Sequence, residues 1–191
     1  MCTYISAIVP KSAELNRLSA IAASFGKDLR TFSNASIERQ LTDAESLFLT
    51  ARGHCDCDSA IGSNTHSRRK SRDLDEERSS LARKGWSNAK IERALSQRME
   101  KILMREQDLN SLRAKDLESW LGFLRTALGS KDVPYVGLLT HHYSGYIEAE
   151  DVSVADRRVV VAADLNEATL ASIEEDVIYR FAVRATHEEW R

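Results

Sequence analysis

The sequence predicts an α+β fold, with an antiparallel, ferredoxin-like (split βαβ) sheet packed on helices. Three observations support this fold class. β-branched and aromatic residues gather in short runs, glycine and proline interrupt those runs, and a long central region changes to helical periodicity. We expect a single domain over residues 1–191, with a long helical-hairpin insertion at 67–130 and an additional C-terminal strand and helix.

The N-terminal region predicts a strand, a helix and two further strands. Residues 2–9 (CTYISAIV) are rich in β-branched and aromatic residues and end at Pro10, which cannot donate to a sheet ladder. Apolar residues at helical spacing then predict a helix between Ser12, its expected N-cap, and Gly26, its expected C-cap. The pattern next predicts a weak strand at 28–32, a helical turn at 36–41 and a better strand at 46–51.

From residue 71 to residue 129 the sequence favours long helices. A first charged helix ends near Gly85, and Ser87 is a suitable N-cap for the next. That second helix carries an apolar stripe formed by Ile91, Leu95, Met99, Ile102, Leu103, Leu109 and Leu112. Asp116 can cap a third helix, which ends at Gly129. Strands at 133–143 and 158–163 and a last helix over 166–179 complete the prediction.

The composition excludes several classes of protein. The chain has 191 residues, 42% hydrophobic and 29% charged, with a formal net charge of -2 and only 8 glycines and 2 prolines. These values exclude collagen-like, linker-dominated and disordered chains. No run of apolar residues is long enough for a membrane span, and no signal-peptide pattern opens the chain. Three cysteines are too few for a disulfide framework, so we expect a cytoplasmic protein.

All three cysteines and three of the five histidines fall near predicted strand ends. In the expected sheet the first strand lies between the third and fourth strands and is antiparallel to both. Its start therefore meets their ends at one edge. The residues placed there are Cys2, His54, Cys55, Cys57, His141 and His142.

Thiolates and imidazoles are the preferred ligands of tetrahedral zinc. We therefore predict a zinc site formed by Cys2, Cys55, Cys57 and one of His141 or His142, with His54 as the spare ligand. Residues two apart in an extended segment point to the same side, so Cys55 and Cys57 could bind one ion. The C-x-C spacing differs from the C-x₂₋₄-C spacing of zinc fingers. The flanking Asp56 and Asp58 could orient a ligating histidine or bind a harder cation.

Two other interpretations of the cysteines stay open. They could be inert, because free cysteine is among the most buried residue types. Removal of the initiator methionine would instead give Cys2 a free α-amine beside its thiol, the arrangement of N-terminal-nucleophile hydrolases. The opening Met-Cys resembles class II glutamine amidotransferases over these two residues, although Thr3 stands where that family has glycine. The resemblance implies an amidohydrolase with Cys2 as nucleophile, and a Cys2–His pair with His54 or His141 as base is the alternative catalytic centre.

The charge of the chain is unevenly distributed. Residues 67–118 hold 14 Lys and Arg against 10 Asp and Glu, a net of +4, whereas residues 146–191 hold 5 against 11, a net of -6. The helix-turn-helix pattern around Ser87 could therefore serve nucleic-acid binding. The candidate contacts are Arg68, Arg69, Lys70, Arg72, Lys90 and Arg93. We favour a solvated helical hairpin that binds another protein or a second copy, in a non-catalytic metal-binding protein.

Overall fold

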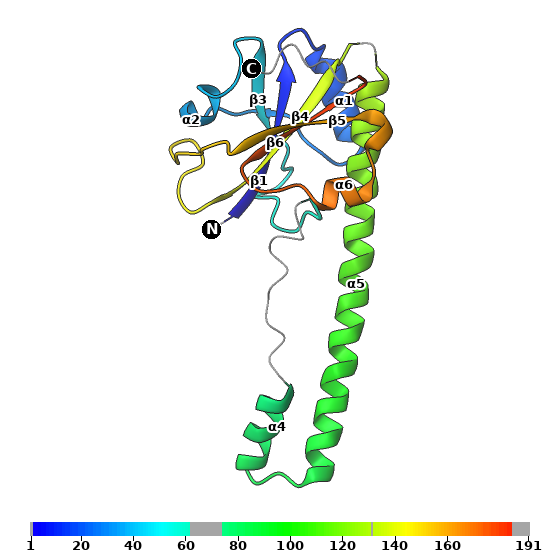
Figure 1. Cartoon of the computed structure of the whole chain (residues 1–191). Coiled ribbons are helices and arrows are strands. Elements are labelled where there is room, and N and C mark those ends of the chain that lie inside the picture. The colour runs from blue at the N-terminus through cyan, green and yellow to red at the C-terminus, as the bar shows by residue number, and fades with distance from the viewer. Residues whose placement is uncertain (1, 62–73, 131, 185–191) are drawn as a thin grey trace. The chain divides into compact units, whose positions relative to one another are not determined.

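The computed structural model describes residues 2–61, 74–130 and 132–184 of the chain (Figure 1). It divides into two compact units. The first comprises Met1–Thr65 together with Asp116–Arg191, and the second comprises His66–Lys115. The candidate site lies in the first unit.

A six-stranded open sheet forms the first unit, in the order β2-β3-β1-β4-β6-β5. Its strands are β1 (Cys2–Pro10), β2 (Arg30–Thr31), β3 (Glu45–Leu49), β4 (Tyr135–Tyr143), β5 (Asp156–Val161) and β6 (Val177–Ala182). The α+β class is confirmed, and β1 lies between β3 and β4 and is antiparallel to both, as predicted. The sheet is nevertheless mixed, because β5 pairs with β6 in parallel.

Short helices flank the sheet. They are α1 (Leu15–Ser24), α2 (Ala35–Glu38), the 3₁₀ turn η1 (Ala162–Asp164) and α6 (Glu167–Ala171). The expected cap at Ser12 is wrong, since α1 begins two residues later and the Glu14 side chain accepts the backbone N–H of Arg17. Asn34 caps α2 by accepting the backbone N–H groups of Ser36 and Ile37.

Each face of the sheet has its own apolar core, because alternate residues of a strand point to opposite faces. On one face, β1, β4 and β6 pack against α1 and the C-terminal part of α5; this core includes Ile5, Ala7, Leu138, Phe181, Leu18, Trp120, Phe123 and Leu124. On the other face, the same strands pack against α2 and the segment before β5; this core includes Ile8, Leu139, Ile178, Ile37 and Val152.

The second unit is helical, containing α4 (Leu74–Arg83) and the first part of α5 (Asn88–Gly129). Gly85, at φ +76°, lies in the turn between the two helices, as the sequence predicts. The expected break at Asp116 is wrong, since α5 runs unbroken for 42 residues. Instead of capping a helix, the Asp116 carboxylate accepts hydrogen bonds from Lys27, Ser59 and Ala60. Among the described residues, no helix combines the length and apolar character that crossing a membrane requires.

The expected helix over 166–179 is also wrong. Only α6 forms there, and the buried run Val177–Ala182 is the strand β6 between β4 and β5. Asp176, immediately before this strand, has a left-handed backbone at φ +60°. This conformation cannot continue a right-handed helix. The backbone N–H of Asp176 donates to Thr140 and its carbonyl accepts from Ala155, so the residue connects β4 to the start of β5.

Candidate metal centre

Cys2, Cys55 and Cys57 come together at one edge of the sheet, as the topology predicts. Their Sγ atoms all lie within 4.8 Å of one another, although more than fifty residues separate Cys2 from the other two in sequence. Cys2 is the first residue of β1, and the other two lie in the loop after β3. The three thiols together could hold a metal ion.

Backbone hydrogen bonds attach the cysteine loop to β1. The backbone N–H and the hydroxyl of Thr50 both donate to the carbonyl of Ile5. Six residues later, the N–H of Asp56 donates to the Thr3 carbonyl at 2.8 Å, and its carboxylate accepts the Ile5 N–H at 2.9 Å. These contacts place the residues on either side of Asp56 next to the start of β1.

The Cys55 and Cys57 thiols differ in their surroundings. The pKa of Cys55 is lowered, and the largest influence is a hydrogen bond from the backbone N–H of Cys57 to the Cys55 sulfur. A hydrogen bond with the Cys57 side chain is the second influence. Partial burial of the Cys57 sulfur raises the pKa of that thiol to about 11, even though it accepts the Thr3 N–H at 3.3 Å. Cys55 is therefore the readier of these two to ionise. Such N–H contacts around a sulfur are typical of the outer shell of metal-binding thiolates.

The solvent access of the thiols does not support the packing interpretation. Cys2 and Cys55 are half-buried and Cys57 is exposed. None of them belongs to either apolar core. Inert cysteines that serve packing are usually fully buried. The partial exposure of these three residues therefore favours a role other than packing.

The three predicted histidines lie outside the three-cysteine group. His54 is exposed in the loop. The Nδ1 atom of His142 lies 3.1 Å from the Thr3 hydroxyl, and its backbone N–H donates to Glu175. His141 belongs to a different cluster of side chains. A fourth ligand from His141 or His142 therefore stays a prediction.

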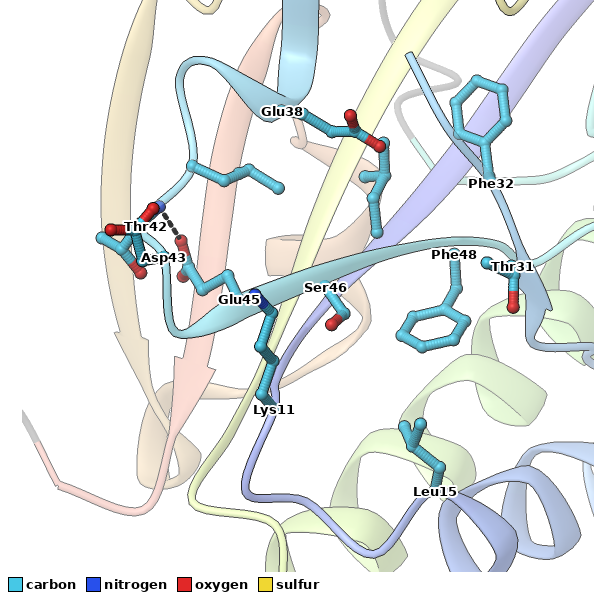
Figure 2. Close-up of a pocket in the computed structure, with 12 residues that line it drawn as sticks. Lys11, Leu15, Thr31, Phe32, Glu38, Thr42, Asp43, Glu45, Ser46 and Phe48 are labelled. Carbon is cyan, nitrogen blue, oxygen red and sulfur yellow. Dashed lines mark hydrogen bonds between the residues drawn. The ribbon is translucent and has the colours of Figure 1, made fainter. Parts of the chain in front are cut away.

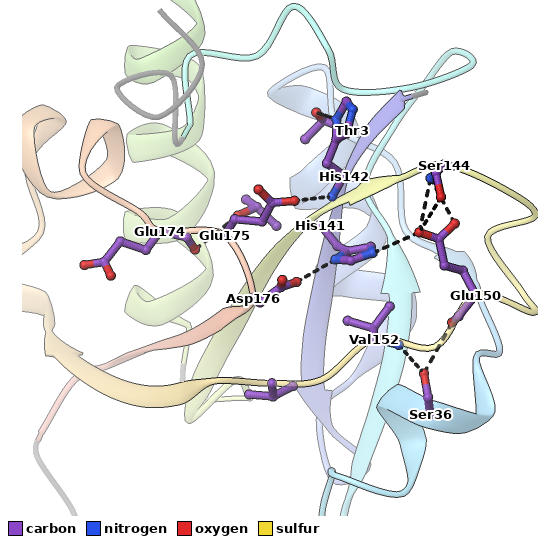
Figure 3. A network of polar contacts seen from close by, with 12 residues as sticks. Thr3, Ser36, His141, His142, Ser144, Glu150, Val152, Glu174, Glu175 and Asp176 are labelled. Carbon is purple, nitrogen blue, oxygen red and sulfur yellow. Dashed lines mark hydrogen bonds and ion pairs between the residues drawn. The ribbon is translucent and has the colours of Figure 1, made fainter.

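That second cluster joins His141 to Glu175 and Asp176 (Figure 3). One nitrogen of His141 and one carboxylate oxygen from each acidic residue lie within 4.8 Å of one another. Sequence reasoning missed the two carboxylates because it assigned them to a helix. In the structure they immediately precede β6, the neighbour of β4, on which His141 lies. The acidic run Glu-Glu-Asp before an apolar stretch was the available signal.

The remaining predicted catalytic and nucleic-acid-binding residues have contacts of other kinds. His141 Nδ1 lies 2.5 Å from Asp176, so its hydrogen bonding is to that carboxylate. In the helical unit, the Lys90 ammonium lies 4.0 Å from the Trp86 ring centroid, and Arg93 donates to the carbonyl of Ala89. The other candidate nucleic-acid contacts, Arg68, Arg69, Lys70 and Arg72, lie outside the described residues.

An open pocket of about 480 Å³ lies beside β3, and no residue of either cluster lines it (Figure 2). Its lining combines apolar side chains such as Phe32 and Phe48 with charged ones such as Lys11, Glu38 and Glu45. Its lining contains no cysteine or histidine, so it brings no soft metal ligand together.

No protein-family model, curated protein or solved structure matches the chain.

Proposed function

We propose that the protein binds one thiolate-preferring metal ion, with zinc as the expected ion, through Cys2, Cys55 and Cys57. The observation that carries this proposal is the convergence of the three Sγ atoms to within 4.8 Å of one another. In a tetrahedral zinc site, Zn–S bonds of about 2.3 Å place the sulfurs about 3.8 Å apart. Only a small closure of the cysteine loop is therefore needed to bind the ion.

The ligand set determines the class of metal. Three thiolates favour soft or borderline ions such as Zn²⁺ or Cu⁺ over Mg²⁺ or Ca²⁺, which prefer oxygen ligands. The protein supplies three ligands here, which leaves one tetrahedral position for water or a fourth side chain. The proposal gives the ion a binding role and assigns no reaction to the site.

Metal analysis of the purified protein tests this proposal directly. Protein prepared under reducing conditions without chelator should contain one zinc per chain. Cobalt substitution should give the intense near-ultraviolet absorption of sulfur-to-cobalt charge transfer. Both signals should be lost in Cys55→Ser and in Cys57→Ser, and kept in the control Asp58→Asn, whose side chain is not in the three-cysteine group. Substoichiometric metal together with no charge-transfer band would contradict the proposal.

Two further measurements complete the test. His141→Ala and His142→Ala show whether an imidazole occupies the fourth position, because losing a ligand changes the cobalt d–d spectrum. Thiol titration distinguishes metal binding from oxidation. A bound ion should protect the thiols until a chelator is added, whereas a disulfide would need a reductant to restore them.

We also propose that the helical unit binds a second copy of the chain. Among the α5 side chains that the structure describes, four large apolar ones are exposed in this unit: Met99, Met104, Leu109 and Leu112. Ile102 and Leu109 are seven residues apart and Leu112 follows three later, which is the spacing of a coiled-coil seam. Light scattering should therefore find a dimer for the wild type and a monomer for the double variant Leu109→Glu/Leu112→Glu. Leu15→Glu, at an exposed site of α1, is the control, and a monomeric wild type would refute the proposal.

A further inference from the structure

The cluster of His141, Glu175 and Asp176 differs in chemistry from the three thiols. It offers one imidazole nitrogen and two carboxylate oxygens, and all three residues are half-buried. Half-buried carboxylates next to one another are unfavourable unless a positive partner compensates them. Within the cluster, the only side chain that can carry positive charge is the imidazole.

Both carboxylates are held in place by the ends of the sheet. The Glu175 carboxylate accepts the backbone N–H of His142 at 2.8 Å. The Asp176 backbone is fixed on both sides, since its N–H donates to Thr140 and its carbonyl accepts from Ala155. The two acidic side chains are therefore positioned by β4 and by the segment that begins β5. They do not lie on a free loop.

The imidazole of His141 lies between two carboxylates (Figure 3). Its Nδ1 atom is 2.5 Å from Asp176 Oδ1. Its Nε2 atom is buried, has no hydrogen-bond partner among the described residues, and faces Glu150 Oε1 at 3.6 Å. The Glu150 carboxylate is itself fixed by the backbone N–H groups of Ser144 and Gly145.

A neutral imidazole has a single N–H and can donate to only one of these two carboxylates. A cation bound by both Nδ1 and the Asp176 carboxylate would replace their hydrogen bond and need the two atoms to open from 2.5 Å to about 3.0 Å, the separation of adjacent ligand atoms with bonds of about 2.1 Å. The ring proton would then lie on Nε2 and face Glu150. Metal-bound histidines commonly direct the other ring nitrogen at a carboxylate in this way. Glu150 would thus act as a positioning residue.

From this geometry we infer a second ion site, in which His141 Nδ1, Glu175 and Asp176 bind a divalent cation of the Mn²⁺ or Fe²⁺ class. One imidazole and two carboxylates suit these harder ions, and the two negative charges match a divalent ion. This ligand set shares no residue with the three-cysteine group. With water or His142 in the fourth position of the thiolate site, the two sites are expected to select different metals and to be filled independently.

Manganese is the probe for this site because it binds thiolates weakly. The electron paramagnetic resonance signal of free Mn²⁺ should decrease on titration with the wild-type protein and report one bound ion per chain. Asp176→Asn and Glu175→Gln should each weaken binding by at least about tenfold. Both amides keep a hydrogen-bond acceptor, and asparagine tolerates the left-handed backbone of residue 176.

Glu174→Gln is the matched control, because Glu174 is the adjacent acidic residue and pairs with Arg158 outside the cluster. This variant should bind Mn²⁺ as the wild type does, and so should Cys55→Ser. No saturable binding up to about 1 mM Mn²⁺, or binding unchanged in both amide variants, would overturn the inference. Circular dichroism shows whether each variant folds. If one of the two amide variants does not fold, Mn²⁺ binding by the other one tests the inference.

The outcome is separable from that of the thiolate proposal. Loss of the cobalt charge-transfer band reports only on the cysteines, and loss of Mn²⁺ binding reports only on the His141 cluster. A protein that binds manganese but gives no charge-transfer band would leave this inference standing and remove the thiolate proposal. A protein that gives the charge-transfer band but binds no manganese would leave the thiolate proposal standing and remove this inference.

Discussion

The side-chain carboxylate of Asp56 accepts the backbone N–H of Ile5 at 2.9 Å. Asp56 lies between Cys55 and Cys57, so this contact attaches both cysteines to β1. Burial, the largest influence, raises the pKa of Asp56 to about 6 from its ordinary value near 3.8. The group that positions the thiols therefore makes folding depend on pH.

The direction of this dependence follows from the raised pKa. Between about pH 4 and pH 6 the folded protein binds more protons at Asp56 than the unfolded chain does, so the unfolding free energy falls as the pH rises. This decrease in the unfolding free energy is complete once the pH is above the folded-state pKa of Asp56. In metal-free protein, Asp56→Asn should remove this dependence, because asparagine does not titrate. Its amide oxygen can still accept the Ile5 N–H. We expect the variant to be about 1–3 kcal/mol more stable than the wild type near pH 7.

Urea unfolding at several pH values, with chelator present, measures this difference. Asp58→Asn is the control, since Asp58 is exposed and should leave the pH profile of the wild type unchanged. A stability difference between Asp56→Asn and the wild type that stays constant from about pH 4 to pH 8 would contradict the raised pKa.

Asp116 attaches the end of the cysteine loop to α5. Its carboxylate bonds to the Lys27 ammonium at 2.7 Å, the Ser59 hydroxyl at 2.7 Å and the Ala60 N–H at 2.8 Å. The pair is largely shielded, with 11% of the Lys27 side chain and 24% of the Asp116 side chain exposed. Asp116→Ala should therefore cost about 2–3 kcal/mol of unfolding free energy, because it leaves two donors without this acceptor and the shielded Lys27 ammonium without its carboxylate, with the Trp120 ring at 4.3 Å as its remaining contact.

Asp132→Ala gives the matched comparison. Its ion pair with Arg17 is much more exposed, at 39% and 59%, so its removal should cost about 0–1 kcal/mol. Asp116→Ala should also weaken cobalt binding by the cysteines, whereas Asp132→Ala should not. Equal losses of stability in the two variants would show that the Asp116 contacts contribute no more than an exposed ion pair does.

The sequence predicted the elements whose side-chain pattern matches their surroundings. The run from Cys2 to Val9 is β-branched and ends at a proline, and it forms the central strand β1. Its pairing with β3 and β4 then placed Cys2 near Cys55 and Cys57. The topology alone was sufficient for that convergence, because the start of one strand and the end of its antiparallel neighbour share an edge.

The failures have local physical causes. The strand β6 is buried along its whole length, so it lacks the polar alternation of a half-exposed strand and was merged with the preceding helix. Without β6, the position of Asp176 beside His141 could not be foreseen. At Asp116 a good capping residue misled the prediction, because its carboxylate is used by distant partners.

Tyr135 donates its hydroxyl hydrogen to Glu45 at 2.9 Å, and both residues are buried. Tyr135→Phe keeps the ring but leaves that carboxylate oxygen without this donor. The variant should lose about 1–3 kcal/mol of unfolding free energy. Tyr146→Phe is the control, since Tyr146 is 86% exposed and its hydroxyl is solvated. Chemical denaturation that finds both variants equal to the wild type would show that the Tyr135 hydrogen bond contributes nothing to stability.

Gly137 lies on β4 directly opposite Ile8 of β1. A Cβ atom at this position would lie 3.0 Å from the Ile8 Cβ and 3.3 Å from the Ile8 carbonyl oxygen. Because neither atom belongs to a flexible side-chain end, the two central strands would have to separate. Gly137→Ala should therefore cost about 1–3 kcal/mol of unfolding free energy. The opposite result is expected for Gly129→Ala, at the end of α5, where a Cβ meets open space and alanine favours the helix. Thermal unfolding of the two variants measures the difference, and a melting temperature for Gly137→Ala at or above that of the wild type would mean that β1 and β4 can separate without loss of packing.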